Sequence, residues 1–442
     1  MKKVSFLLKN TLLITSVSLL MRSVSLFFQT RVTGMIGAEG MGLLQLVMSV
    51  QVLAITVATS GIRYSSTRLI SEELGLKRAG PARLVMRRCF LYALFFGLLS
   101  CFALFFFADG LSVFAGDARV APALRLLAPG MPFLAVNSVF CGYFSAVRTP
   151  WKLSAVQLLE QLVGMAAVFI CLPLAKDLGI ARACAVIAGC FSLSDLVSFS
   201  AALILFMFGR PRASVRGSSS RGVSARLVKT SLPIALSSYA RTTLSTLQHV
   251  MVPSALRRSG ASASSALSLY GTVHGMVFPV ITFPQTFFYS LSELLIPELT
   301  TAQVRGDRLR SERIAGRVIS CALILAVGSS LFFFLFGPRL GEMLYKGQNT
   351  GEYIRVMAPL AAVMYLDTVT DGMLKGLGLQ LDSMYINIAD AAVSLVLINT
   401  LIPLAGIKAY IGVVFFSECF NFLLSFARLS RAVRIRLNIK AL

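Results

Sequence analysis

Long apolar stretches, separated by short polar segments, run along the whole chain. Most contain about 20 residues, the length at which an α-helix crosses the hydrocarbon core of a membrane. The stretches are continuously apolar and do not alternate with polar residues, so they indicate helices rather than the strands of a membrane barrel. We expect twelve membrane-spanning helices, at residues 10–34, 41–62, 88–108, 120–144, 153–174, 183–208, 229–255, 265–291, 316–337, 354–374, 383–404 and 407–428.

A stripe of polar residues interrupts the first predicted helix. Its members recur at spacings of three and four residues, which places them on one helix face: Thr11, Thr15, Ser18, Arg22, Ser25 and Gln29. A second stripe of the same residue types lies in the seventh predicted helix: Thr230, Ser237, Arg241, Ser245 and Gln248. Each stripe has an arginine near its middle.

The two stripes belong to an internal repeat. Two further pairs of segments recur in the same order along the chain, LISEEL (69–74) with LIPELT (295–300) and RLLAP (125–129) with RVMAP (355–359). Each half holds six predicted helices and enters the membrane from the same side, so we expect a pseudo-two-fold axis along the membrane normal.

A short polar segment separates the two halves. GRPRASVRGSSSRG (209–222) is rich in Gly, Ser and Arg and has the composition of a linker. We therefore predict an all-α polytopic membrane protein with a six-helix lobe at 1–208, a basic cytoplasmic linker at 209–227 and a six-helix lobe at 228–442.

Composition and charge support this picture. The chain has 442 residues, of which 56% are hydrophobic and only 14% charged, whereas roughly a quarter are charged in soluble proteins. The net charge is +23, and most of the 42 Lys and Arg residues lie on the side of both termini. The positive-inside rule identifies that side as the cytoplasm, so the charge does not indicate a nucleic-acid partner. The first apolar segment lacks a signal-peptide cleavage pattern and is expected to remain as a span.

The central arginines are the candidate binding residues. An arginine at the bilayer centre costs about 2.5–3.5 kcal/mol on insertion scales, so it should face protein or water. Guanidinium stays charged and binds phosphate or carboxylate through two parallel hydrogen bonds. We expect a cavity for an anionic head group, lined by Arg22, Arg241, Gln29, Gln248, Ser18, Ser25 and, as a weaker candidate, Arg63. The alternative is a buried ion pair with Glu160, Asp195, Asp367 or Asp390.

Polar residues in the second half suggest a cation site. Asp367, Asn387, Asp390 and Asn421 offer oxygen ligands for sodium or a path for a proton. Hydrogen bonds between helices are an equally good explanation. The eight cysteines form no CxxC pair and there are only two histidines, so we expect no metal site and no cofactor beyond Na⁺ or H⁺ as a coupling ion.

Prolines predict bends in three helices. Pro removes a helical hydrogen bond and allows a kink. Pro279 and Pro284 fall in the eighth predicted helix and Pro359 in the tenth, while three prolines fall in the fourth: Pro122, Pro129 and Pro132.

Three segments carry a family resemblance: GAEGMGLLQLVMSVQVLAITVATSGIRYSSTRLISEELG (37–75), FPVITFPQTFFYSLSELLIPELT (278–300) and LDTVTDGMLKGLGLQ (366–380). They resemble the stage V sporulation protein B-like branch of the multidrug/oligosaccharidyl-lipid/polysaccharide (MOP) exporter superfamily, which includes MurJ-type lipid II flippases and MATE drug exporters. Members of this branch often have fourteen helices, two more than expected here. The resemblance implies that arginines on the first helix of each lobe engage a lipid-linked pyrophosphate, and Arg22 and Arg241 match those positions.

The function implied by this resemblance is transport, not enzymatic catalysis. It is the translocation, by alternating access, of a polyprenyl-pyrophosphate-linked oligosaccharide or peptidoglycan precursor from the inner to the outer leaflet of the bacterial inner membrane. An anionic head group moving outward travels down the membrane potential, worth about 2.3 kcal/mol per charge per 100 mV. No ATP-binding GxxxxGK[ST] motif occurs. The protein is expected to act as a monomer, with the membrane and the lipid-linked precursor as its partners.

Three alternatives stay open. A MATE-like exporter of organic cations, coupled to a cation gradient, would favour acids rather than arginines at the cavity centre. An integral membrane enzyme would need a cluster of acid/base or metal-binding groups at the membrane surface, whereas the predicted loops are short and basic. A non-transporting assembly factor of envelope polysaccharide synthesis is the third.

Overall fold

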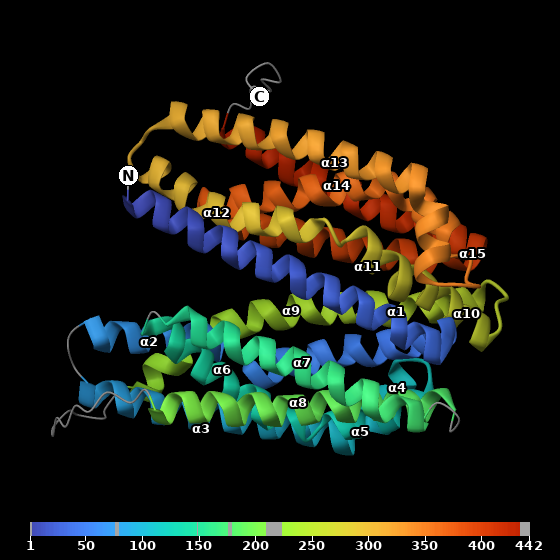
Figure 1. The fold of residues 1–442 in the computed structure, drawn as a ribbon, viewed down its shortest axis with the longest axis horizontal. Coiled ribbons are helices and arrows are strands. Elements are labelled where there is room, and N and C mark those ends of the chain that lie inside the picture. Colours follow the sequence, from blue (N-terminus) through green and yellow to red (C-terminus); the bar gives the residue numbers. More distant parts are fainter. Residues whose placement is uncertain (1, 76–78, 148, 176–178, 209–222, 434–442) are drawn as a thin grey trace. The chain divides into compact units, whose positions relative to one another are not determined.

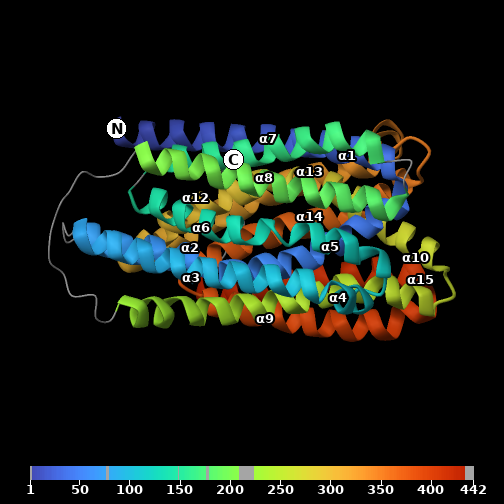
Figure 2. The same ribbon diagram turned by 90° about the horizontal axis from the view of Figure 1, so that it is seen from below.

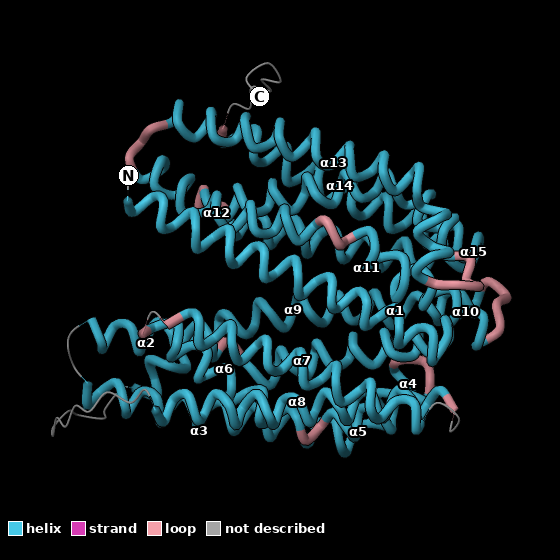
Figure 3. Tube along the Cα trace, in the orientation of Figure 1, coloured by secondary structure: helices cyan, strands magenta, loops and turns pink. Residues whose placement is uncertain are grey.

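The computed structural model describes residues 2–75, 79–147, 149–175, 179–208 and 223–433. Within these ranges the chain is helical apart from short turns and contains no strand (Figure 3), so the all-α prediction is confirmed.

The helices are α1 Lys2–Thr59, α2 Ile62–Gly75, α3 Ala79–Phe106, α4 Ala108–Phe114, η1 Ala118–Val120, α5 Ala121–Leu127, α6 Gly130–Ala146, α7 Pro150–Ala175, α8 Ile180–Phe208, α9 Val223–Arg258, α10 Ala263–Tyr270, η3 Gly271–Val277, α11 Phe278–Ile281, α12 Gln285–Val304, α13 Arg308–Leu344, α14 Thr350–Gly376 and α15 Gln380–Ala432.

Two helices are far longer than a membrane is thick. α1 has 58 residues and α15 has 53, and at about 1.5 Å per residue each would exceed twice the roughly 30 Å of the hydrocarbon core. Both change direction at a glycine, since Gly37 has a φ of 70° and Gly406 a φ of 58°. Glycine adopts this left-handed conformation without strain. Each long helix therefore consists of two segments that meet at a turn.

Several described helices are suited to crossing a membrane. Six are long and apolar enough, or up to eight if two bent helix pairs each count as one span. α9 and α14, where spans at 229–255 and 354–374 are predicted, are not among the six. Polar and charged residues lower their hydropathy, including Arg241 in α9 and Asp367 and Asp371 in α14.

Two of the predicted proline bends coincide with breaks in the structure. The segments Ala118–Leu127 and Gly130–Ala146 meet at 49°, with Pro129 in the break. The segments Ala263–Ile281 and Gln285–Ser292 meet at 58°, with Pro284 in the break; this break is the short loop between α11 and α12 in Figure 3. α14, by contrast, continues through Pro359.

The chain forms two compact units. Unit 1 comprises Met1–Gly42 and Met251–Leu442, and unit 2 comprises Leu43–Val250. Within unit 1, α14 packs against α12, α13 and α15 (Figure 1). Within unit 2, α6 packs against α2, α3 and α8, and α7 runs beside α8 (Figure 2).

These units differ from the predicted lobes 1–208 and 228–442. The first stripe helix, in residues 1–42, belongs to the unit built by the second half of the chain, and most of α9 belongs to unit 2. Each stripe helix thus packs with helices of the opposite half of the sequence. The predicted linker also ends earlier than 227, because α9 begins at Val223; residues 209–222 lie outside the described part of the chain.

Two glycines allow α1 to approach the helix formed by α10 and η3 within unit 1. A Cβ atom at Gly42 would lie 2.1 Å from the carbonyl oxygen of Leu267, and one at Gly271 would lie 2.1 Å from the carbonyl oxygen of Ala38. Both distances are far below van der Waals contact. No side chain larger than that of glycine fits at either position.

Glycines with positive φ also recur at equivalent turns of the two halves. Each of the following pairs has one member in each half of the chain, and the pairs follow the same order: Gly37 and Gly260, Gly116 and Gly347, Gly179 and Gly406. This backbone pattern supports the internal repeat found in the sequence.

Replacing Gly271 by alanine should destabilise the protein, because the added methyl group overlaps the Ala38 carbonyl. Overpacking of this kind costs about 1–3 kcal/mol. Thermal melting of the purified protein in detergent, followed by size-exclusion chromatography, measures the loss. Gly412→Ala in α15 is the matched control, since nothing lies within 4 Å of a Cβ atom there. Equal melting temperatures for the two variants would contradict the close approach of the helices.

Candidate functional site

Arg22 is held against the broken helix of unit 1. Its side chain is half-buried, and Nη2 donates a hydrogen bond to Oγ1 of Thr282 at 2.8 Å. Thr282 lies in the break between α11 and α12, and its hydroxyl donates to the carbonyl oxygen of Phe278 at 2.7 Å. The break therefore presents a side-chain acceptor to the arginine at a point where the regular helix is interrupted.

The charge of Arg22 has no counter-ion among the described residues. The guanidinium forms no ion pair with them, and its one hydrogen bond goes to a neutral hydroxyl. Among the described residues of unit 1, Arg22 therefore does not form the alternative ion pair with Asp367 or Asp390. A guanidinium has five N–H donors, so most of its donors and its full charge are available to a ligand or to water.

Gln29 binds a carbonyl group that the π-helical turn η3 presents. A π-helical turn widens the helix and often marks a functional site. Gln29 Nε2 donates to the carbonyl oxygen of Gly275, inside η3, at 2.7 Å. In the same turn His274 stacks on Tyr270, with ring centroids 5.5 Å apart, which supports a packing role for this histidine.

Another member of the first stripe is bonded within its own helix. Ser25 donates to the carbonyl oxygen of Met21, in its own helix, at 2.9 Å. Ser18 lies in α1, but its side chain is outside the described part of the structure. Arg22 and Gln29 are the stripe residues whose described hydrogen bonds reach the broken helix.

The second stripe has different surroundings in unit 2. Arg241 is exposed and its side chain has no partner among the described residues. Two threonines near Arg241 are among the side chains that hold α9 in unit 2: Thr242 pairs with Thr56 at 3.3 Å, and Thr246 donates to the carbonyl oxygen of Ser49 at 3.1 Å. The packed face of α9 is thus offset by about one residue from the stripe, and Arg241 stays outside it.

Two further predicted residues lie in unit 2. Gln248 is half-buried and has a partner. Arg63, at the start of α2, is exposed, and within the described residues only its backbone carbonyl is bonded, to the hydroxyl groups of Ser66 and Thr67. No contact in unit 2 brings Arg63 and Arg241 together.

Three of the four candidate cation ligands are close together in α15. Asn421 Nδ2 donates to Asn387 Oδ1 at 3.0 Å, and Asp390 accepts from the hydroxyl of Ser417 at 2.8 and 2.9 Å. Asp367 is in α14, where its Oδ1 is buried without a hydrogen-bond partner among the described residues. Hydrogen bonds between the two segments of α15 therefore explain most of this set. The described residues contain no group of three or more His, Cys, Asp or Glu side chains that could hold a metal ion.

A buried polar chain in unit 2 was not predicted. Asn137 Nδ2 donates to the hydroxyl of Ser198 at 2.7 Å, and that hydroxyl donates to Glu160 Oε2 at 2.7 Å. Nearby in α8, Asp195 is 6% exposed and its Oδ2 has no partner among the described residues. One feature of the sequence pointed to these buried polar residues, because Glu160 and Asp390 occupy matching positions in the two halves.

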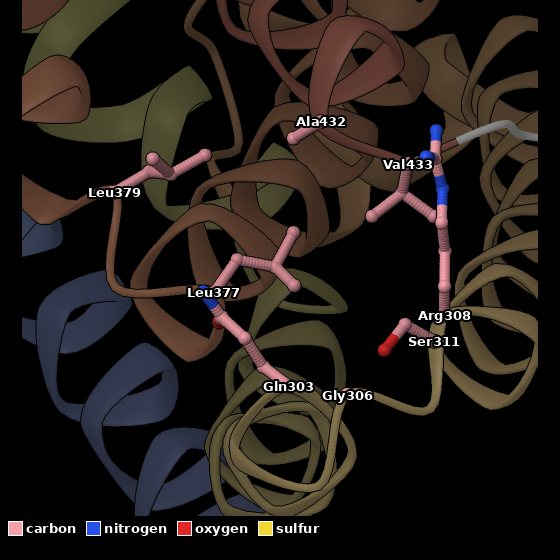
Figure 4. Close-up of a pocket in the computed structure, with 8 residues that line it drawn as sticks. All are labelled: Gln303, Gly306, Arg308, Ser311, Leu377, Leu379, Ala432 and Val433. Carbon is pink, nitrogen blue, oxygen red and sulfur yellow. The ribbon is translucent and has the colours of Figure 1, made fainter.

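A surface cavity with an empty volume of about 550 Å³ lies where the ends of α12, α14 and α15 meet the start of α13 in unit 1. Figure 4 shows the aliphatic side chains of Leu377, Leu379 and Val433 at its border, together with the side chain of Arg308. None of the predicted site residues lines it. The stripe arginines therefore belong to a different part of the molecule from this cavity.

Comparisons with known proteins point to one superfamily. The chain matches the family model described as "Polysaccharide biosynthesis protein" over residues 7–303. It is 23% identical to stage V sporulation protein B of Bacillus subtilis (strain 168), over 100% of this chain and 86% of that protein. It is 21% identical to sporulation protein YkvU of the same organism, over 81% of this chain and 80% of that protein.

A solved structure shares the fold. It is the inward-facing conformation of a multidrug resistance MATE family transporter of the MOP superfamily, with a TM-score of 0.72 and 16% identity, covering 92% of this chain and 94% of that one. This likeness establishes a MATE-like fold, and the protein is a multi-pass membrane protein. The matched families are transporter families and not enzyme families.

Replacing Gln29 by leucine should loosen η3, because the carbonyl of Gly275 loses its donor. An unsatisfied buried carbonyl costs about 1–3 kcal/mol. Hydrogen exchange of peptides covering residues 271–285, measured by mass spectrometry, should become faster. Ser23→Ala is the control on the same helix, since among the described residues the hydroxyl of Ser23 bonds only the carbonyl of Leu19. Unchanged exchange in the Gln29 variant would contradict a role for Gln29 in holding the turn.

Proposed function

The chain belongs to the polysaccharide biosynthesis protein family of the MOP superfamily, and we propose that it is a flippase for a lipid-linked sugar precursor. The proposed cargo is a polyprenyl-pyrophosphate-linked oligosaccharide or peptidoglycan precursor. It moves from the inner to the outer leaflet of the bacterial inner membrane by alternating access. The matched family supports the polysaccharide connection, and the similarity to stage V sporulation protein B agrees with the branch that the three sequence segments resemble.

The observation that carries this proposal is the unpaired charge of Arg22. A half-buried guanidinium with no ion pair among the described residues attracts an anion strongly, because the membrane interior screens charge poorly. Pyrophosphate is doubly suited to it, since it carries negative charge and accepts parallel hydrogen bonds from guanidinium. Arg241 in unit 2 supplies a second guanidinium, which is exposed. Gln29, Gln248, Ser18, Ser25 and Arg63 are proposed to add polar contacts to the head group.

The proposed membrane arrangement has twelve spans, with both termini in the cytoplasm. The six apolar helices and the two bent pairs give eight spans, and counting α1 and α15 as two spans each gives ten. The helices α9 and α14 complete the twelve. The excess of Lys and Arg on the side of the termini supports this orientation. We propose a monomer, in which no nucleotide is hydrolysed and the membrane potential drives the anionic head group outward.

A second candidate is a MATE-like exporter that couples organic cations to a sodium or proton gradient. The fold shared with a MATE family transporter favours it, as do the carboxyl groups Asp367 and Asp390 in unit 1. Its substrates are positively charged, so the unpaired Arg22 would repel them. We therefore place it second.

Removing the arginine charges should stop transport. In proteoliposomes with a fluorescent polyprenyl-pyrophosphate disaccharide, Arg22→Ala and Arg241→Ala should each lower the rate of translocation about tenfold or more. A hydrogen bond to a charged group is worth about 1.5–3 kcal/mol, and 1.4 kcal/mol corresponds to a factor of ten. Arg339→Ala is the control, since Arg339 is exposed and unpaired among the described residues.

Full activity of Arg22→Ala and Arg241→Ala would refute the proposed head-group site. Movement of organic cations by the intact protein against a sodium or proton gradient, without movement of the lipid, would establish the second candidate instead.

Sodium should stabilise the protein if it is the coupling ion held by Asp367, Asn387, Asp390 and Asn421. At ten times its dissociation constant, a ligand adds about 1.4 kcal/mol of stability. The melting temperature should therefore be higher in NaCl than in KCl, and Asp390→Asn should remove the difference. Asp382→Asn is the control, because Asp382 is ion-paired with Arg428 instead. Equal melting of the intact protein in both salts would exclude sodium at this site and leave the proton.

A further inference from the structure

The two duplicated arginines have unequal surroundings. Arg22 is half-buried and bonded to Thr282 at 2.8 Å. Arg241 is exposed and has no partner among the described residues. The surroundings of Arg22 are those of unit 1, and the surroundings of Arg241 are those of unit 2. The sequence repeat gives no sign of this difference, because Thr11, Ser18 and Gln29 of the first stripe match Thr230, Ser237 and Gln248 of the second.

Thr282 is well placed to hold a guanidinium in one orientation. Its hydroxyl hydrogen is directed to the carbonyl oxygen of Phe278, at 2.7 Å, so a lone pair of the same oxygen points away from the helix and accepts from Arg22. The acceptor sits in the break between α11 and α12, where the two segments meet at 58°. Only one of the five N–H groups of Arg22 is used in this bond.

The matching threonine of the other half has no arginine partner among the described residues. Thr56 is the repeat counterpart of Thr282, because AIT (54–56) matches VIT (280–282) at the same offset as LISEEL and LIPELT. Like Thr282, Thr56 donates a hydrogen bond to the carbonyl oxygen four residues earlier, that of Val52, at 2.8 Å. Its other contact is the hydroxyl of Thr242 at 3.3 Å. At this position α1 is an unbroken helix. The two threonines thus share their local bonding and differ in the contact to arginine.

We propose that Thr282 is a positioning residue that orients Arg22 for the phosphate groups of the cargo, so that the two arginines have different roles. This inference rests on the proposed function. A guanidinium fixed in its plane before the ligand arrives loses less freedom on binding and keeps its fork of donors aligned. Arg22 then acts as an oriented two-pronged anchor, and Arg241 acts as a mobile positive charge.

The inference predicts a difference between arginine and lysine at the two positions. Lysine carries the charge but lacks the planar fork. Arg22→Lys should therefore weaken binding of the pyrophosphate about tenfold, whereas Arg241→Lys should weaken it only about threefold or less. Binding is measured on the full-length protein in detergent by titration calorimetry, with farnesyl pyrophosphate as a short soluble probe and farnesol as the uncharged control.

Thr282→Val tests the positioning directly, because valine keeps the shape of threonine and removes the hydroxyl. It should weaken farnesyl pyrophosphate binding about fivefold to tenfold and leave farnesol binding unchanged. Thr282→Ser should restore binding. Thr56→Val is the matched control, because it removes the same back-bonded hydroxyl from a threonine that does not contact an arginine, and its affinity should equal that of the unaltered protein.

A double-mutant comparison separates positioning from general damage to the fold. In the Arg22→Lys background, Thr282→Val should cause no further loss, because the oriented fork is already absent. An equal loss from Thr282→Val in both backgrounds, or an equal loss from Thr282→Val and Thr56→Val, would overturn the positioning role. Unaltered binding by Arg22→Ala would instead overturn the proposed head-group site itself, so the two failures are distinguishable.

Discussion

A guanidinium among membrane-spanning helices needs hydrogen-bond acceptors and a counter-charge, because lipid supplies neither. Arg22 obtains one acceptor from Thr282 and no ion pair among the described residues. Its remaining donors and its charge are left for water or for an anionic ligand. Beyond the turn at Gly37, α1 also comes close to the helix whose break contains Thr282, at Gly42 and Gly271.

Arg22 and Gln29 both find their hydrogen-bond acceptors where the backbone of the neighbouring helix is irregular. The π-helical turn exposes the carbonyl of Gly275 to Gln29, and the break beside Pro284 exposes Thr282 to Arg22. In unit 2 the matching helix is regular around Thr56, which bonds Thr242 instead of an arginine. The two stripes belong to the internal repeat, and the bond that holds Arg22 goes to the break in the helix, which has no counterpart around Thr56.

The sequence predicted the features that depend on local pattern. Apolar runs gave the helices, Pro129 and Pro284 gave two bends, and spacing gave the polar stripes. It did not predict the partners of the stripes, because the bond between Arg22 and Thr282 joins residues 260 positions apart. Periodicity shows that polar residues share a face of a helix but not which neighbour covers that face. For the same reason the packed face of α9, with Thr242 and Thr246, lies beside the predicted stripe and not on it.

The central claim is that the phosphate groups of a lipid-linked precursor bind at Arg22. A cryo-electron microscopy structure of the full-length protein with bound polyprenyl pyrophosphate tests it most directly. Our account predicts phosphate density within hydrogen-bonding distance of the Arg22 guanidinium, about 2.7–2.9 Å, with the bond to Thr282 retained. Phosphate density at another site, with Arg22 bonded to Thr282 alone, would contradict it.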